Sequence, residues 1–161
     1  MVSNQPKYSM FHRIVETDGT QEYCFKNGIG MILYSPLDQG ILTDKYRNLK
    51  IPVGSRVTER AHLQVEIKKD YYQKPLTELY QLADELNVPL SSLALQWLFQ
   101  QKAVTSAIIG AKTPDQVTEN IKCMELKLTP EVLAKIDTIL LKRKAYILKE
   151  DSDEILKKCR V

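Results

Sequence analysis

The stretch that decides the fold class is Gly28-Ile29-Gly30-Met31-Ile32-Leu33-Tyr34-Ser35-Pro36-Leu37. Residues 29–34 form a continuous apolar run between turn-forming residues, and such a run is typical of a strand buried on both faces. A second run of this kind covers residues 104–110, Val-Thr-Ser-Ala-Ile-Ile-Gly. Strands buried on both faces occur in parallel sheets that are covered by helices. The sequence therefore predicts an α/β protein with a parallel sheet.

Helical segments alternate with these strands. Thr113 and Thr129 are each followed by proline, and both pairs are helix-start signals because threonine caps the first turn and proline suits its first position. Gln116 completes a capping box with Thr113. The only tryptophan, Trp97, falls on an apolar helix face and is expected in the core. The expected helices cover residues 21–26, 76–86 and 90–101 and begin again after Thr113 and Thr129.

A third, short strand is expected within residues 1–5. Residues 38–74 show weak periodicity, and we interpret them as a long, exposed connection with some helix around residues 58–72. An eight-stranded barrel needs roughly 250 residues, so 161 residues are too few to close one. Three parallel strands leave two edges unpaired. The sequence thus predicts either part of a larger sheet or a chain that needs a partner.

Composition narrows the class of protein. The net charge of +3 is too small to indicate binding to nucleic acid or to an acidic membrane. No stretch approaches 18 apolar residues, so no membrane insertion is expected, and the first six residues lack leader features, which predicts a cytoplasmic protein. Three widely spaced cysteines are expected as reduced thiols. His12 and His62 are 50 positions apart, so no metal site is expected.

Two loops that follow the expected strands are candidate ligand sites, because ligands of parallel sheets bind beyond the carboxyl ends of strands. Gly110 and Lys112 precede a helix start, where free N–H groups and the helix dipole favour an anion; a solvated lysine beside a well-capped helix is the alternative. Tyr34 could stack on a flat ligand ring or simply pack in the core. Gln5 could hold an amide-bearing ligand through its carboxamide.

Four segments together resemble the aldo-keto reductase family, in order and in spacing, over roughly residues 2–140. The similarity is strongest to the branch of the potassium-channel β-subunits and the general stress reductases. The matching segments are residues 3–11 (SNQPKYSMF), 28–46 (GIGMILYSPLDQGILTDKY), 94–98 (ALQWL) and 104–120 (VTSAIIGAKTPDQVTEN).

The resemblance implies a partial (β/α)8 TIM barrel, with residues 1–140 as the C-terminal half of the domain and residues 141–161 as a charged, helical tail. It also implies NADP(H) as cofactor. Gln5 would hold the nicotinamide amide, Tyr34 would stack on its ring, and Lys45 and Arg56 would close over the pyrophosphate. The pyrophosphate loop would be Ser35, Pro36, Leu37, Gln39 and Gly40, and the adenosine end would contact Gly110, Lys112, Thr113, Gln116, Glu119 and Asn120.

The family's catalytic Asp, Tyr, Lys and His belong to the other half of the barrel, and no residue here matches them. We therefore expect an NADP-dependent carbonyl oxidoreductase domain that is inactive by itself, with a missing N-terminal half-barrel or a second copy as its partner. The alternative is a non-catalytic remnant or a regulatory β-subunit-like module. Asp38 and Asp44 replace the family's usual Ala and Gly. Near a pyrophosphate each would cost about 1–4 kcal/mol before salt screening, so weak cofactor binding is expected.

Overall fold

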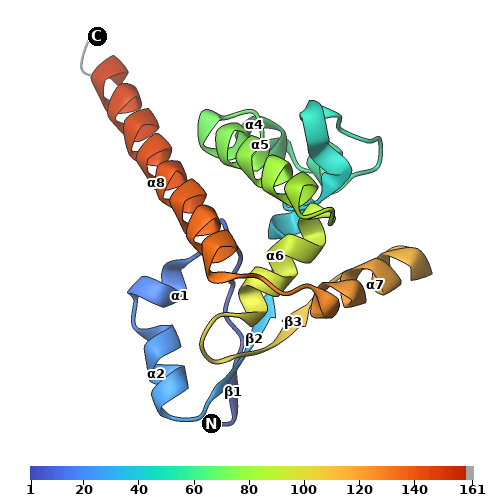
Figure 1. Ribbon diagram of the computed structural model, residues 1–161. Coiled ribbons are helices and arrows are strands. Elements are labelled where there is room, and N and C mark those ends of the chain that lie inside the picture. Colours follow the sequence, from blue (N-terminus) through green and yellow to red (C-terminus); the bar gives the residue numbers. More distant parts are fainter. Residues whose placement is uncertain (159–161) are drawn as a thin grey trace.

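The computed structural model describes the backbone of residues 1–158 and the side chains of residues 1–144 and 146–147. Its sheet contains β1 (Ser3–Asn4), β2 (Gly30–Tyr34) and β3 (Val104–Ile108). The three strands are parallel, in the order β1-β2-β3 (Figure 1). This confirms the predicted α/β class and the three parallel strands.

The helices follow the predicted order, and both threonine-proline starts are confirmed. Thr113 Oγ1 accepts from Gln116 N at 3.3 Å, and Thr129 Oγ1 accepts from Val132 N at 3.4 Å. The α-helices are α1 (Ile14–Thr17), α2 (Thr20–Lys26), α3 (Arg56–Glu59), α4 (Ala61–Glu66), α5 (Asp70–Glu85), α6 (Leu90–Phe99), α7 (Pro114–Ile121) and α8 (Pro130–Lys158). Short 3-10 turns cover Asp38–Gly40, Asp44–Leu49 and Lys122–Glu125.

The core lies on one face of the sheet. Met31 and Leu33 of β2 are fully buried there, and Trp97 of α6 is buried as predicted. The other face is open: Tyr34 is 45% exposed and its β3 partner Ile108 is 47% exposed. The prediction that these strands are buried on both faces is therefore wrong, because no described residue covers the second face.

Residues 56–66 confirm one part of a prediction and correct another. The segment was expected to be an exposed connection with some helix, and it forms α3 and α4 with most of its residues exposed. Val57 and Leu63, followed by Ile67, are nevertheless buried in the core. Leu63 and Ile67 are four residues apart, so one helical turn places both on the buried side. This packing gives the loops around residue 55 a fixed support.

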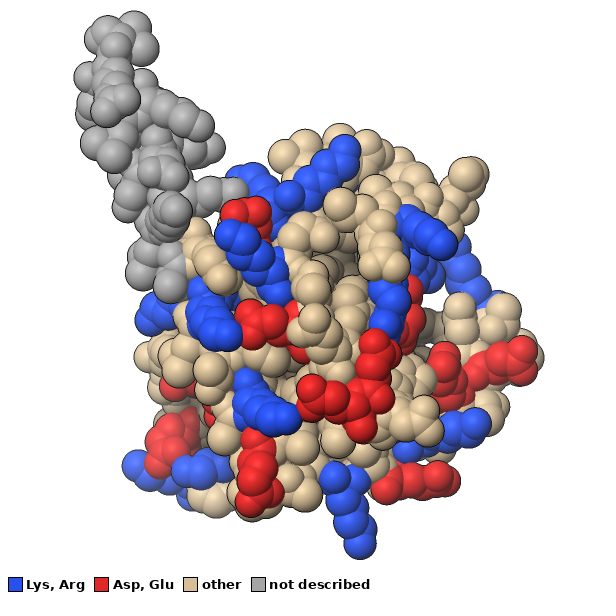
Figure 2. Space-filling model, turned by 45° about the horizontal axis from the view of Figure 1, so that its top comes forward, with Lys and Arg blue, Asp and Glu red and all other residues tan. Residues whose placement is uncertain are grey.

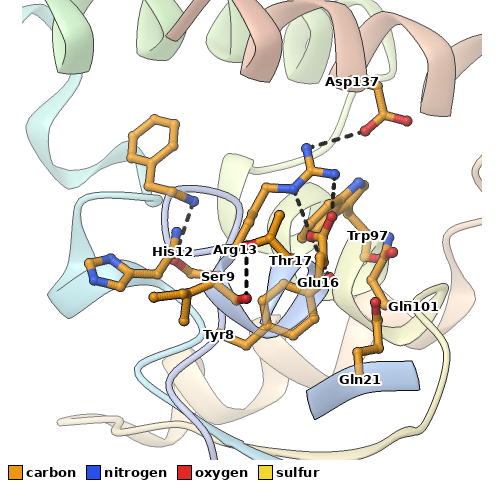
Figure 3. A network of polar contacts seen from close by, with 12 residues as sticks. Tyr8, Ser9, His12, Arg13, Glu16, Thr17, Gln21, Trp97, Gln101 and Asp137 are labelled. Carbon is orange, nitrogen blue, oxygen red and sulfur yellow. Dashed lines mark hydrogen bonds and ion pairs between the residues drawn. The ribbon is translucent and has the colours of Figure 1, made fainter. Parts of the chain in front are cut away.

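The C-terminal helix α8 packs on α5 and is tied to α1 by a polar network (Figure 3). Arg13 binds Glu16 at 2.7 and 2.8 Å and reaches Asp137 of α8 at 3.4 Å. Tyr8 donates its hydroxyl to Glu16 at 2.7 Å, and the Arg13 guanidinium lies 5.2 Å from the Trp97 ring centre. Helix α8 continues without a break through residue 141, so the division of the chain there stays a prediction.

The surface mixes both signs of charge. Figure 2 shows acidic and basic side chains interspersed over one face, in keeping with the small net charge of +3. None of the described helices combines the length and the apolar character that a bilayer crossing requires. Cys24 and Cys123 are buried free thiols, and Cys159 lies outside the described residues.

Candidate ligand-binding site

A cavity of about 700 Å³ opens beyond the carboxyl ends of β2 and β3. Its walls come from the loop after β2, the residues around the start of α3, the loop after β3, and α7. Most of the predicted site residues lie here, although they are up to 85 positions apart in the sequence. They are Ser35, Pro36, Leu37, Gln39, Gly40, Lys45, Arg56, Gly110, Lys112, Gln116, Glu119 and Asn120.

Three predicted residues do not line this cavity. Tyr34 ends β2 on the open face of the sheet, and Gln5 follows β1 with its side chain exposed. Thr113 uses its hydroxyl to cap α7. The cavity therefore gathers most of the residues expected at the phosphate and adenosine end, while the two expected at the nicotinamide lie outside it, Tyr34 on the uncovered sheet face and Gln5 just after β1. The assigned binding roles stay predictions.

The loop after β2 has an unusual backbone. Ser35, Asp38 and Gln39 have φ angles of 53°, 45° and 60°, and Gly40 follows at 95°. Left-handed conformations cost energy for residues other than glycine and cluster at functional sites. Hydrogen bonds within the loop hold it, including Asp38 N to Ser35 O and Gly40 N to Leu37 O, each 2.9 Å long. The loop is thus pre-formed around the cavity.

Asp38 does not face the cavity, contrary to what the resemblance implies. Its side chain is 2% exposed, and Tyr72 of α5 donates to its Oδ2 at 3.4 Å. Burial and, after it, the Asp38 charge raise the pKa of Tyr72, so the phenol stays protonated and remains a donor. The carboxylate is turned inward, so it does not contact a phosphate in the cavity directly.

Asp44 does line the cavity, but its charge is compensated. Its Oδ2 accepts from Leu90 N at 3.0 Å, which caps the start of α6, and its Oδ1 accepts from Arg47 at 2.9 Å. Arg47 also binds Asp84 at 2.8 and 2.9 Å. A carboxylate held in this way stabilises the wall of the cavity, and its charge is partly offset by an arginine that it shares with Asp84.

Three cations on the cavity wall have no carboxylate partner among the described residues: Lys45, Arg56 and Lys112. Lys112 Nζ donates to the carbonyl oxygen of Gly54 at 3.4 Å, and a side chain at Gly110 would meet Arg56 Nη2 at 4.0 Å. Glu119 is an acidic residue of the wall that remains uncompensated. The cavity therefore carries an excess of positive charge and suits an anion.

Sequence reasoning missed part of the lining. Some of these residues are adjacent in sequence to predicted site residues, and that adjacency could have identified them. Ser91 lies at the start of α6, far in sequence from any predicted site residue, and no local pattern indicates it. The missed residues are Thr43, Tyr46, Ser55, Ser91, Ile108 and Ile109, whereas Asp44 was expected near the pyrophosphate and does line the cavity.

Comparison with known proteins agrees with this fold. The model of the aldo/keto reductase family matches residues 1–141. A probable voltage-gated potassium channel subunit beta of Arabidopsis thaliana is 36% identical over 144 residues, which are 86% of this chain and 44% of that protein. The L-glyceraldehyde 3-phosphate reductase of Escherichia coli K12 is 33% identical over 146 residues, 85% of this chain and 41% of that protein.

Among solved structures, the thermostable aldo-keto reductase Tm1743, crystallised with the inhibitor epalrestat, superposes with a TM-score of 0.62 at 26% identity. The match covers 86% of this chain and 40% of that one. With most of its residues matched by the family model, this chain belongs to the aldo/keto reductase family. It spans about two fifths of the length of the relatives it matches.

Proposed function

We propose that residues 1–141 supply the NADP(H)-binding part of a carbonyl oxidoreductase. The observation that carries the proposal is the cavity, in which two loops distant in sequence bring together the family's expected phosphate and adenosine residues. Lys45, Arg56 and Lys112 give that cavity the charge that a phosphorylated nucleotide needs. The cytoplasm is the compartment that we propose for this activity.

Cofactor binding by this chain is proposed to be weak. One reason is the open sheet face, on which Tyr34 is 45% exposed, and Gln5 is exposed as well. A nicotinamide ring stacked on Tyr34 would be covered on one side only, and a ring that remains hydrated gains little from burial. The phosphate and adenosine groups would then supply most of the affinity.

The proton donor of carbonyl reduction is proposed to come from outside residues 1–141. Reduction needs a hydride donor and an acid of tuned pKa that contacts the carbonyl oxygen. The cavity offers cations, amides and hydroxyls suited to holding a cofactor. Tyr34, a phenol at the end of β2, is proposed to act as a stacking surface and not as that acid.

Fluorescence titration of the chain with NADPH tests the proposal. We expect weak binding that a tenfold increase in salt weakens further, because phosphate contacts are ionic. Replacing both Arg56→Met and Lys112→Met should lower the affinity about tenfold or more. The matched control, Lys68→Met with Lys74→Met, removes the same charge away from the cavity and should leave the affinity unchanged. Unaltered binding by the first double variant would contradict the proposal.

A second candidate is a regulatory module without catalysis, which the similarity to a probable potassium channel subunit beta favours. Both candidates predict cofactor binding in the same cavity. They differ in whether aldehyde reduction appears once the remainder of a barrel is supplied, because a regulatory module has no need of the proton donor.

A further inference from the structure

Helix α8 continues beyond the part of the chain that the family model matches, and its next residues still contact the body of the protein. Lys142 Nζ donates to Glu78 Oε2 of α5 at 2.7 Å, and the Tyr146 ring centre lies 4.8 Å from Lys74 Nζ. Arg143, between them in sequence, contacts a different set of residues. This end of α8 is therefore packed on the fold.

The guanidinium of Arg143 lies among three aromatic rings from two separate parts of the chain. Its Cζ is 4.6 Å from the ring centre of Phe11, in the loop after β1, and 5.2 and 5.6 Å from those of Tyr72 and Tyr71 on α5. Phe11 and Tyr72 are buried and meet edge to face, with ring centres 5.4 Å apart. The Nε of Arg143 is buried and has no hydrogen-bond partner among the described residues, so the rings hold this part of the side chain. A cation is attracted to aromatic faces, more strongly away from water, and Arg143 thus helps to fix where Tyr72 lies.

Tyr72 connects this cluster to the loop that lines the cavity. Its hydroxyl donates to Oδ2 of the buried Asp38 at 3.4 Å. The backbone of Asp38 forms two of the bonds that hold the loop, from Asp38 N to Ser35 O at 2.9 Å and from Ile41 N to Asp38 O at 3.2 Å. Asp38 has a left-handed φ of 45°, and a residue other than glycine keeps such a conformation only where its surroundings hold it. The Tyr72 hydroxyl supplies such a contact.

We propose that Arg143 is a positioning residue for the cavity loop, residues 35–40, and that it acts through Tyr72 and Asp38. The inference rests on the proposed function, because this loop lines the cavity in which the cofactor is proposed to bind. It adds that the end of α8 controls the cavity: the loop keeps its backbone conformation while this end is docked and loosens when it is released. Because coupling between two sites is reciprocal, a ligand that binds the formed loop also strengthens the docking of the helix end.

Hydrogen exchange of the loop amides tests the proposal without any ligand. The probes are the amides of Asp38 and Gly40, which both donate within the loop. Arg143→Met keeps the length of the side chain but removes the cation, and it should speed the exchange of both amides about fivefold or more. Arg143→Lys keeps a cation beside the rings and should retain most of the protection. Equal exchange of both loop amides in wild type and Arg143→Met would overturn the proposal.

A matched control comes from the preceding residue of the same helix. Lys142→Met removes the same charge and breaks the ion pair with Glu78, so it weakens the contact between α8 and α5 without removing the cation beside Tyr72. It should leave the exchange of the loop amides unchanged. The amides of β2 report a general loss of stability, and their acceleration to the same extent as the loop amides in Arg143→Met would also contradict a positioning role.

Tyr72→Phe tests the route through the hydroxyl, because it removes the bond to Asp38 and keeps the ring. It should speed exchange of the loop amides by itself. In that background Arg143→Met should have little further effect, since the link to the loop is already broken. Independent, multiplying effects of the two substitutions would show that Arg143 does not act through Tyr72.

NADPH titration of the same variants relates the loop to the cavity. Arg143→Met should bind NADPH more weakly than wild type, and Lys142→Met should bind it as wild type does. Equal affinity of wild type and Arg143→Met would overturn the control of the cavity by the helix end. Faster loop exchange in Arg143→Met combined with no NADPH binding by wild type would overturn the proposed function and leave the positioning role of Arg143 in place.

Discussion

At the scale of single residues, His12 is a titratable group whose proton affinity the fold lowers. It lies half-buried in the loop after β1, with Lys7 Nζ 3.1 Å from its Nε2 and with a buried, unpartnered Nδ1. Burial and, after it, the Lys7 charge lower the pKa of His12 below 6.5; Arg143 adds to this, while Asp38 and Glu66 oppose it. Neutral His12 is therefore the form that the folded chain favours.

The sign of the resulting pH dependence follows from linkage. The unfolded chain binds the His12 proton at a higher pH than the folded chain, so protonation favours unfolding. The contribution of His12 to stability is complete above about pH 6.5 and is lost as the pH falls toward the lowered pKa. Urea unfolding is measured at pH 7.5 and at pH 5.5. Between these two pH values the free energy of unfolding should fall less for His12→Gln than for wild type. His62→Gln, at an exposed site on α4, should behave as wild type does; equal acid losses for all three chains would refute the argument.

Asp44 gives a second residue-scale prediction, which reverses the expectation from the family pattern. Asp44→Gly removes the cap of Leu90 N and one partner of Arg47. We expect a loss of about 1–2 kcal/mol in the free energy of unfolding and no gain in NADPH affinity. Urea unfolding and the NADPH titration measure both, and tighter binding by Asp44→Gly would restore the repulsion argument.

At the scale of elements, the network around Arg13 predicts how α8 is held. Arg13 is 31% exposed and Glu16 22% exposed, so the pair is only partly screened by water. Arg13→Met removes the guanidinium that lies over Trp97 and leaves Glu16 without its cation, and we expect a loss of about 1–3 kcal/mol in unfolding free energy. Lys26→Met removes an exposed ion pair with Glu22 and should change the free energy of unfolding by less than about 0.5 kcal/mol. Equal effects of the two variants would contradict this account of α8.

Exposed apolar side chains lie on helix α7 and on the 3-10 turn that follows it. Val117 is 44%, Ile121 62% and Met124 63% exposed. Exposed apolar patches and unpaired strand edges favour association, so the chain is expected to self-associate. Ile121→Lys should reduce association in sedimentation velocity, while Thr118→Lys on the same helix adds an equal charge outside the apolar face and should not. A monodisperse 18.5 kDa wild-type monomer would overturn this expectation.

Local patterns predicted those elements that depend on neighbouring residues. The run at 29–34 and the Thr113-Pro114 start are examples, because strand burial and helix capping involve residues close in sequence. Contacts across long separations were not predictable: Asp44 caps Leu90 from 46 positions away. The exposure of β3 was missed for the same reason, since an apolar run does not reveal which of its faces is covered.

At the scale of the whole molecule, we propose that residues 1–141 bind the cofactor and that another part of the barrel supplies the proton donor. Residues 1–141 match the family model, and the chain spans about two fifths of the matched relatives. The cavity holds the residues proposed for the cofactor's phosphates. The remaining strands of a barrel would have to pair with the free edges of β1 and β3 and so enclose the open sheet face, on which Tyr34 and Ile108 lie.

The measurement that tests this division most directly is NADPH oxidation with a reactive aromatic aldehyde. It is recorded for the chain alone and again after adding the N-terminal part of the Escherichia coli relative. We predict no turnover by the chain alone, because no proton donor contacts the carbonyl, and measurable turnover once the added part docks on the open sheet face. Turnover by the chain alone that Tyr34→Phe abolishes would contradict the account, since Tyr34 would then be the acid.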